Sequence, residues 1–292
     1  MEYLYHILIL ISMYGILALA QNLVMGTTGL LTIAGAAFYG IGAYTAAILA
    51  TKFGFNIFST LFIAPLAAGL IALMVGESFA RFRDDYFMLA TLGFLMIFNT
   101  VARNWEDFTG GSYGIAGIPK PHIFGFVFDT PLSFMWLSLV IIMIVTTITY
   151  FISRSSFGRV LNAIREDEDA LSVFGYKTST YKLLVFAIGA ALSSLSGVLF
   201  ASYLTFIDSN LFTVNESILL WAMVILGGLA KNRGALLGAL LLIVIPEGLR
   251  FIGFPVEFAA LLRQCMYGLL LVFLMLYRPK GILGTYKLRT IL

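Results

Sequence analysis

The chain has 292 residues, of which 60% are hydrophobic and only 11% are charged, with a formal net charge of +3. Soluble domains carry about 25% charged residues, so this composition excludes an ordinary soluble protein and predicts a polytopic membrane protein. Lysine and arginine form no cluster of the kind that binds nucleic acid, and the single Cys265 excludes a disulfide framework and a cysteine metal site.

The first apolar run, near residues 4–25, has some features of a secretory signal peptide, because Ala18-Leu19-Ala20 resembles a cleavage site. Against this, the opening MEYLYH carries Glu2 and no lysine or arginine, and the apolar run continues to Met25. We therefore expect a retained first membrane span.

Apolar stretches long enough to cross a bilayer, about 17–25 residues each, recur along the whole chain. They fall near residues 4–25, 28–50, 57–80, 86–102, 132–152, 183–207, 216–230, 234–252 and 258–277. The second is rich in glycine and the seventh is short, so broken or re-entrant segments are expected among them. The sequence predicts an all-α bundle of about nine spans (8–10), forming one transmembrane domain over residues 1–292.

The distribution of basic residues predicts the orientation. If residues 153–182 are cytoplasmic, alternation places 13 of the 18 lysines and arginines on that side, including those of the C-terminal tail. The other side keeps Lys52, Arg103, Lys120, Arg250 and Arg263. The C-terminus is therefore predicted to be cytoplasmic, and an odd number of spans places the N-terminus outside.

Small residues recur along several spans, as in Gly234-xxx-Gly238 and on one side of the span near 183–207. Helices in lipid associate by close backbone approach at such residues, so helix packing is the first interpretation. The alternative is that some glycines mark hinges or unwound turns beside a substrate path. With the few polar residues at or near membrane depth, they give these pathway candidates: Asn22, Gly35, Gly40, Asn99 and Ser217.

Acidic residues near the spans are few, and Glu77 and Glu216 are expected at span ends, where water reaches them. A charge at the bilayer centre costs roughly 2.5–3.5 kcal/mol on insertion scales, and ion-coupled carriers keep such residues for function. The sequence therefore offers little for a proton or sodium relay.

The long connection over residues 103–131 contains several glycines together with Pro119, Pro121 and Pro131, which argue against a continuous helix. By alternation it is extracytoplasmic. Glu106 and Asp107 either meet basic residues of a partner or are simply solvated, and both interpretations remain open.

The densest run of charge lies in residues 153–182, predicted to be a cytoplasmic loop. Phe157, Val160, Leu161 and Ile164 recur at helical spacing, and Leu171 and Phe174 do so before Gly175, a residue suited to end a helix. The pattern predicts two short amphipathic helices joined around 165–169, with Leu171 and Phe174 on one side. On pattern alone, a docking element and a plain connecting loop are equally consistent with it.

Here the sequence resembles a known family. SSFGRVLNAIREDEDALSVFG, residues 155–175, is similar to the cytoplasmic loop of bacterial ABC-importer permeases of the branched-chain amino acid type. GAAFYGIGAYTAA (35–47), the Arg81-Phe82-Arg83 element with Tyr86, MVILGGLAKNRGALLGA (223–239), PEGLR (246–250) and YRPKGILG (277–284) resemble other segments of that family in the same order. The resemblance covers nearly the whole chain. This chain departs from the family's usual pattern at Ala34-Gly35, Glu77 and Asp84-Asp85, in the half that is expected to line the pathway.

The resemblance implies a permease subunit with the architecture of type II importers, in a bacterial plasma membrane. Its implied partners are a second, different permease subunit, two cytoplasmic ATPases that bind ATP and magnesium, and an extracytoplasmic binding protein. Asp169-Ala170-Leu171-xxx-Gly175 is similar to the motif by which such permeases dock on their ATPases. The implied ATPase-coupling residues are Arg159, Arg165, Glu166, Asp167, Glu168, Asp169, Ala170, Leu171, Phe174 and Gly175.

The chain itself has no phosphate-binding loop of the Gly-xxxx-Gly-Lys-Ser/Thr type, so neither an enzyme nor a bound cofactor is expected. A branched-chain amino acid is the expected solute, and a urea or amide importer of the same family is the main alternative. An ion-coupled carrier would need charges at membrane depth, a passive channel would need no docking loop, and an integral membrane enzyme would need clustered His, Asp, Glu or Cys.

The orientation is directly testable. Single cysteines placed at Ser155 and at Tyr286, in a Cys265→Ser background, are expected to resist a membrane-impermeant maleimide in intact cells, because both face the cytoplasm. Labelling after the cells are broken open serves as the control for reactivity. Ready labelling of both positions in intact cells would contradict the predicted topology.

Overall fold

The computed structural model describes residues 2–79, 82, 84–123, 126–250, 268, 269, 272 and 281–284. The predicted ninth span near 258–277 lies almost entirely outside these residues, as do Arg81, Arg83 and the tail beyond residue 284.

The described residues are mostly helical, and the eight longest helices follow one another along the chain. They are α1 (Glu2–Gln21), α2 (Gly35–Lys52), α3 (Ile57–Phe79), α4 (Asp84–Asn104), α6 (Pro131–Arg154), α9 (Thr178–Leu204), α10 (Val214–Gly227) and α11 (Asn232–Arg250). The shorter elements are α5 (Glu106–Thr109), α7 (Ser156–Glu166), α8 (Glu168–Val173), β1 (Ile115–Ala116), β2 (His122–Ile123), β3 (Phe126–Val127) and β4 (Phe206–Ile207).

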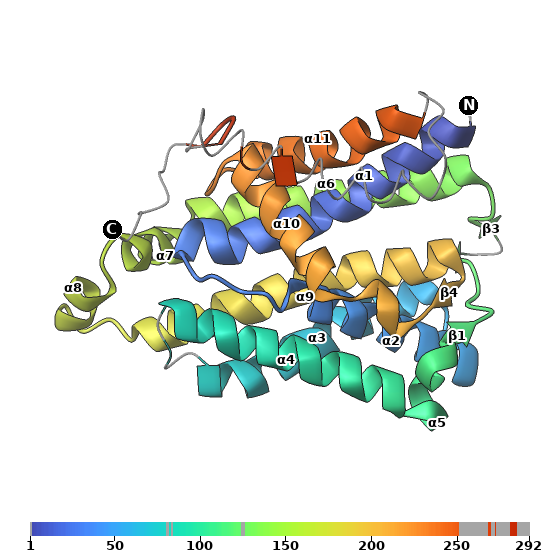
Figure 1. Cartoon of the computed structure of the whole chain (residues 1–292), viewed down its shortest axis with the longest axis horizontal. Coiled ribbons are helices and arrows are strands. Elements are labelled where there is room, and N and C mark those ends of the chain that lie inside the picture. Colours follow the sequence, from blue (N-terminus) through green and yellow to red (C-terminus); the bar gives the residue numbers. More distant parts are fainter. Residues whose placement is uncertain are drawn as a thin grey trace.

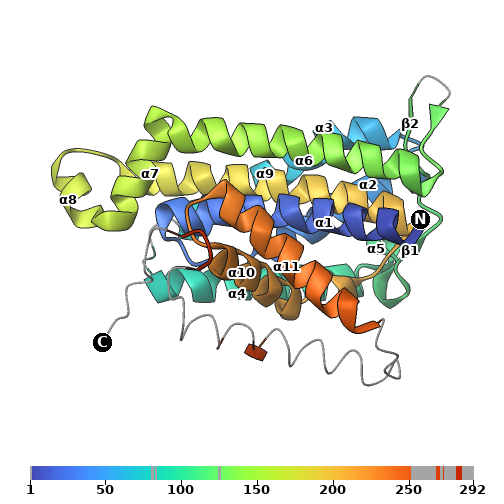
Figure 2. The same cartoon turned by 90° about the horizontal axis from the view of Figure 1, so that it is seen from above.

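The long helices form an elongated bundle with different elements at its two ends (Figures 1 and 2). One end carries α7 and α8, and the other carries the start of α1 together with α5, β1 and β4. At the second end β1 pairs antiparallel with β4, which joins the connection after α4 to the end of α9. The predicted pair of short amphipathic helices is confirmed as α7 and α8, and 103–131 contains no continuous helix, also as predicted.

The centre of the bundle is formed where α2 and α9 pack against each other, with α1 and α3 alongside. A side chain at Gly42 would overlap the backbone of Ser194, and one at Gly197 would overlap the backbone of Tyr39. Gly234 and Gly238 lie equally close to the backbone of α10. These glycines pack helices together, so the packing interpretation is confirmed for them.

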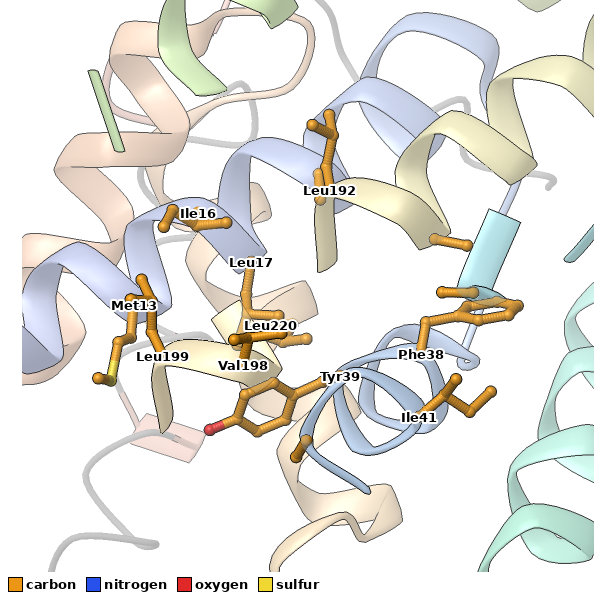
Figure 3. Close-up of a cluster of buried hydrophobic side chains, with 14 of the residues drawn as sticks. Met13, Ile16, Leu17, Phe38, Tyr39, Ile41, Leu192, Val198, Leu199 and Leu220 are labelled. Atoms are coloured by element: carbon orange, nitrogen blue, oxygen red, sulfur yellow. The ribbon is translucent and has the colours of Figure 1, made fainter. Parts of the chain in front are cut away.

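The side chains around this contact come from four helices (Figure 3). Leu17 of α1, Tyr39 of α2, Val198 of α9 and Leu220 of α10 converge there, and their apolar atoms are buried. Burial of this kind fixes which faces of the helices meet, while the glycines set how closely the backbones approach.

Among the described residues, six helical segments are long and apolar enough to cross a membrane by length and composition. They are Glu2–Gly26, Ile57–Phe79, Asp85–Asn104, Pro131–Arg154, Thr178–Leu204 and Ser209–Gly227. These six do not confirm the predicted count of about nine spans. One reason is local: the predicted span 28–50 is not helical throughout, since α2 begins only at Gly35.

The glycine contact between α2 and α9 generates a stability prediction. Gly42→Ala is expected to lower the free energy of unfolding by about 1–3 kcal/mol, because its methyl group displaces the backbone of Ser194. Gly93→Ala is the matched control, since an added Cβ at that position of α4 meets nothing within 4 Å. The melting temperatures of the two variants in detergent test this. Equal melting temperatures for both and the unchanged protein would show that the contact contributes nothing.

Candidate functional site

The regular helical structure is interrupted between α1 and α2, inside the bundle. After α1 the chain makes a π-helical turn, Asn22–Gly26, and stays helical through Thr27 and Thr28. Residues 29–34 then run without helical structure until α2 begins. Gly29 has a φ of 77°, a left-handed conformation that glycine adopts without strain. The backbone N–H and C=O groups in this break lack the hydrogen bonds that a helix would provide, so they need other partners.

Those partners come mainly from side chains of α1 and α10. Gln21 Nε2 and Trp221 Nε1 both donate to the carbonyl oxygen of Thr32, at 2.9 Å and 2.6 Å. Ser217 Oγ donates to the carbonyl oxygen of Ile33 at 2.6 Å and accepts the N–H of Ala36 at 3.2 Å. An unpaired backbone group in hydrocarbon costs several kcal/mol, so these contacts hold the break in place.

The structure brings two of the predicted pathway candidates, Gly35 and Ser217, together at this break. Gly35 is the first residue of α2 and lies against Gln21 and Leu220, where a larger side chain would not fit without movement. Asn22, the first residue of the π-helical turn, is fully buried, and its Oδ1 accepts the backbone N–H of Ala230 at 3.0 Å. The Nδ2 atom of Asn22 has no hydrogen-bond partner in the part of the chain that the structure describes.

The other two candidates lie together elsewhere, around Phe212. Asn99 Nδ2 donates to the carbonyl oxygen of Phe212 at 2.6 Å. Gly40 leaves room for the rings of Phe98 and Phe212, which a Cβ at this position would displace. Both residues therefore have structural explanations in this conformation.

A small cavity adjoins the break, lined in part by Gln21, Thr32, Gly35, Phe38 and Ser193. Its volume is about 10 Å³, which is enough for one water molecule at most. In this conformation the cavity cannot hold an amino acid.

The expectation that Glu216 lies at a span end, where water reaches it, is wrong. Instead, the Oε2 atom of Glu216 accepts a hydrogen bond from the Tyr14 hydroxyl at 3.3 Å. Tyr14 is the middle residue of the segment Glu2–Gly26. The first turn of α10 thus lies well inside the bundle, since the chain from Ser209 reaches that depth in a 3₁₀ turn before the helix starts.

Two polar side chains, Arg165 and Glu168, hold α7 and α8 against the rest of the chain. Arg165 Nη1 donates to the carbonyl oxygen of Gly26, at the end of the first helical segment. Glu168 accepts from Lys182 Nζ in an ion pair and from Thr178 Oγ1 at 3.0 Å, both on α9. Lys182 is only 3% exposed, so Glu168 is the counter-ion of a buried charge. These two predicted coupling residues are therefore attached to their own chain.

The short helix α8 has a well-defined beginning and end. Asp167 caps its start by accepting the N–H of Ala170 at 3.0 Å. At its end Gly175 has a φ of 85°, and Tyr176 donates its N–H to the carbonyl oxygen of Leu171 at 3.2 Å. This is a Schellman-type end, and it fulfils the expectation that Gly175 ends the helix.

The exposed apolar residues of this loop differ in part from the expectation. Phe174 is 80% exposed, but Leu171 packs partly against the chain's own core. Val173, which is 86% exposed, takes the expected place beside Phe174. The remaining predicted coupling residues also lie on the surface of the loop: Arg159, Glu166, Asp169 and Ala170.

A groove of about 580 Å³ lies beside these helices, between α7 and the start of α9. Phe157, Tyr176, Tyr181 and Leu184 provide its apolar walls, and Lys177 adds a charge. An aromatic groove next to two exposed apolar side chains is a typical docking surface for a protein partner.

The predicted outer residues Glu106 and Asp107 lie on α5, at the opposite end of the bundle, and both are exposed. Lys52 Nζ donates to the backbone oxygen of Asp107 and lies 5.0 Å from the centre of the Phe108 ring. The carboxylates themselves remain available to solvent or to a partner. Within the described ranges, no three His, Cys, Asp or Glu side chains are close enough to hold a metal ion.

Several important residues were not singled out from the sequence. Gln21, Thr32 and Trp221 hold the break, and Lys182 pairs with Glu168. Trp221 and Gln21 gave a weak signal as polar groups inside apolar runs. The partnership of Lys182 and Glu168, 14 residues apart, gave none, because only the packing of α8 on α9 brings them together.

Together, the apolar helices, the broken second segment and the charged loop at one end define a polytopic α-helical membrane protein with the features of a transport permease. A family model described as "Branched-chain amino acid transport system / permease component" matches residues 3–275. The chain therefore belongs to this permease family. Members of this family are transport components, so the chain is a transport subunit and not an enzyme.

Among curated relatives, the "High-affinity branched-chain amino acid transport system permease protein LivM" of Escherichia coli K12 is 35% identical over 94% of this chain and 68% of its own length. The "High-affinity branched-chain amino acid transport system permease protein BraD" of Pseudomonas aeruginosa is 26% identical over 94% of this chain and 92% of its own length. LivH of Escherichia coli K12 is 25% identical over the same shares. No solved structure matches the chain.

The ion pair between α8 and α9 leads to a prediction about the loop. Glu168→Gln is expected to destabilise the protein by about 3–5 kcal/mol, because it leaves Lys182 buried without a counter-ion. Combining it with Lys182→Met is expected to restore much of the stability. Melting temperatures and amide hydrogen exchange over residues 168–175 measure both effects.

Glu166→Gln is the control for this prediction, because Glu166 is exposed and its substitution is expected to change stability by no more than about 0.5 kcal/mol. If Glu168→Gln behaves like Glu166→Gln, the ion pair does not hold α8 in place.

Proposed function

We propose that this chain is a transmembrane permease subunit of an ATP-driven importer of branched-chain amino acids. Family membership supports the class of transport subunit, and the names of the relatives support the solute. The observation that carries the coupling role is the arrangement of α7 and α8. Arg165 of α7 bonds to Gly26 and Glu168 of α8 pairs with Lys182 of α9, while Val173 and Phe174 are exposed.

A loop built this way suits a subunit driven by a separate motor. The exposed apolar pair and the adjoining aromatic groove offer anchors for a cytoplasmic ATPase, and the surrounding charges fix the register of docking. The contacts of Arg165 and Glu168 then pass a displacement of the loop to the end of the first helical segment and to α9. Two such ATPases are the proposed partners.

A second permease subunit is the proposed membrane partner. Two different permease proteins, LivM and LivH, are relatives of this chain in Escherichia coli K12. The cavity beside the break is too small for an amino acid. We therefore place the pathway between two permease subunits, with Gly35 and Ser217 near it and Asn22, Gly40 and Asn99 supporting the helices around it.

The proposed topology has nine passages across a bacterial inner membrane, with the N-terminus outside. Residues 27–52 support the second passage, since they connect Gly26, beside Arg165, to Lys52, beside Asp107 at the opposite end. The N–H of Ile282 bonds to Leu226 at the α7 end, whereas Glu247 contacts Tyr3 at the other end. Residues 247 and 282 thus lie at opposite ends of the bundle, which supports a ninth passage.

The remaining assignments follow from this orientation. Residues 153–182 form the proposed cytoplasmic coupling loop within a single domain, and 103–131 form the proposed extracytoplasmic loop. Glu106 and Asp107 are proposed contacts for an external solute-binding protein, because they are exposed acidic residues at the outer end.

The test is transport by the whole assembly, with both permeases, the ATPases and the binding protein in liposomes. ATP-dependent uptake of labelled leucine is expected to exceed uptake of urea. Phe174→Ala is expected to weaken association with the ATPase by about 2 kcal/mol or more, the usual cost of truncating an anchoring aromatic, and to reduce uptake in proportion. Copurification in detergent and uptake in liposomes measure the two effects.

Tyr113→Ala is the matched control, because Tyr113 is an equally exposed aromatic at the opposite end of the bundle. It is expected to leave association with the ATPase unchanged. Normal association and uptake with Phe174→Ala would remove the docking role, and a preference for urea would remove the proposed solute.

A further inference from the structure

Glu216 is an acidic side chain at the middle depth of an apolar bundle. Its Oε2 is 3.3 Å from the Tyr14 hydroxyl, and Tyr14 has twelve residues on either side of it in the segment Glu2–Gly26. At a rise of 1.5 Å per residue, Tyr14 lies about 18 Å from each end of that segment. A carboxylate at such a depth is costly, and it is retained where it meets a functional partner.

That partner is not a basic residue among the described part of the chain. The lysines and arginines there lie at or beyond the ends of the long helices, and the recorded ion pairs join Lys120 to Asp129 and Lys182 to Glu168. Among the described residues, the hydrogen bond to the Glu216 side chain comes from Tyr14, a neutral donor. The Glu216 carboxyl group therefore has no cationic partner within these residues.

The surroundings of Glu216 resemble a binding site more than a packed core. Glu216 is half-buried, and its neighbours Asn215 and Ile218 on the same helix are exposed. Ser217, the next residue, bonds to both sides of the break before α2. Transporters commonly place ligand groups beside interrupted helices at the bilayer midplane.

Tyr39 places a second aromatic hydroxyl in this region. It lies one turn into α2, and its side chain extends toward Val198 of α9 and Leu220 of α10 (Figure 3). Leu220 is one turn along α10 from Glu216. Aromatic rings attract cations by their faces, so a carboxylate with tyrosines nearby suits an ammonium group.

We propose that Glu216 binds the protonated amino group of the transported amino acid as it passes the middle of the membrane, with Tyr14 orienting the carboxylate. The ligand class is a primary ammonium compound with an apolar side chain. This inference rests on the proposed function. It assigns to this chain a specificity-determining charge, and the surrounding apolar residues contact the aliphatic part of the solute.

The test uses the complete assembly in liposomes. Glu216→Gln keeps the shape of the side chain and removes its charge, and leucine uptake is expected to fall by about tenfold or more, as for the loss of a charge-assisted hydrogen bond. Glu216→Asp is expected to retain part of the uptake. Glu77→Gln is the matched control, since Glu77 is an exposed carboxylate near the end of α3, and uptake is expected to stay unchanged.

A second measurement uses the unmodified assembly and a photoreactive leucine analogue, with the cross-linked peptides identified by mass spectrometry. Labelling of α1, α2 or α10 is expected to be suppressed by isoamylamine, which keeps the ammonium group. It is expected to resist 4-methylpentanoate, which keeps only the carboxylate. Equal suppression by both compounds, suppression by 4-methylpentanoate alone, or no labelling of these helices would overturn the proposal even if Glu216→Gln fails to fold.

The outcomes also separate this inference from the proposed function. If the unmodified assembly neither transports leucine with ATP nor is labelled, the proposed function fails. If it does both but Glu216→Gln, folded and assembled, transports leucine at the same rate, only the role of Glu216 is refuted.

Discussion

The need to satisfy backbone polar groups away from water governs this structure. A continuous helix meets that need by itself, but the chain leaves the helical path between Thr28 and Gly35. Side chains from distant parts of the sequence replace the lost helical bonds there: Gln21 precedes the break, and Ser217 and Trp221 come from α10. The position of α10 is fixed by this requirement, and the position of Glu216 follows from that of α10.

The long helices and the two end loops could be predicted because their signals are local. Apolar length predicts the spans, and the charge and helical spacing of 153–182 predict α7 and α8. The end of α8 at Gly175 could also be predicted, because glycine alone adopts its left-handed conformation without strain. The small residues of these spans predicted close helix packing, and Gly42 and Gly197 do pack in this way. Which backbone each one contacts could be found only from the fold.

What could not be predicted depends on depth and on distant partners. Apolar length alone does not distinguish a continuous helix from an extended stretch followed by one, so α2 starts seven residues later than the predicted span 28–50. Glu216 lies near the predicted start of a span, and its depth became evident only from its contact with Tyr14. Leu171 was expected beside Phe174 on the exposed side, but it is partly buried and Val173 is exposed instead. The rotation of a helix as short as α8 depends on what it packs against, which its own sequence does not determine.

The two kinds of contact around α2 differ in how they respond to force. On one side, Gly42 and Gly197 place its backbone directly against α9, so sliding the two helices past each other requires close-packed atoms to separate. On the other side, α10 reaches the start of α2 through side-chain hydrogen bonds, each contributing about 0.5–1.5 kcal/mol and able to exchange with water or a solute. The bundle thus has one stiff helix contact, between α2 and α9, and one compliant contact, between α2 and α10. The compliant contact lies next to Glu216, at the middle depth of the bundle.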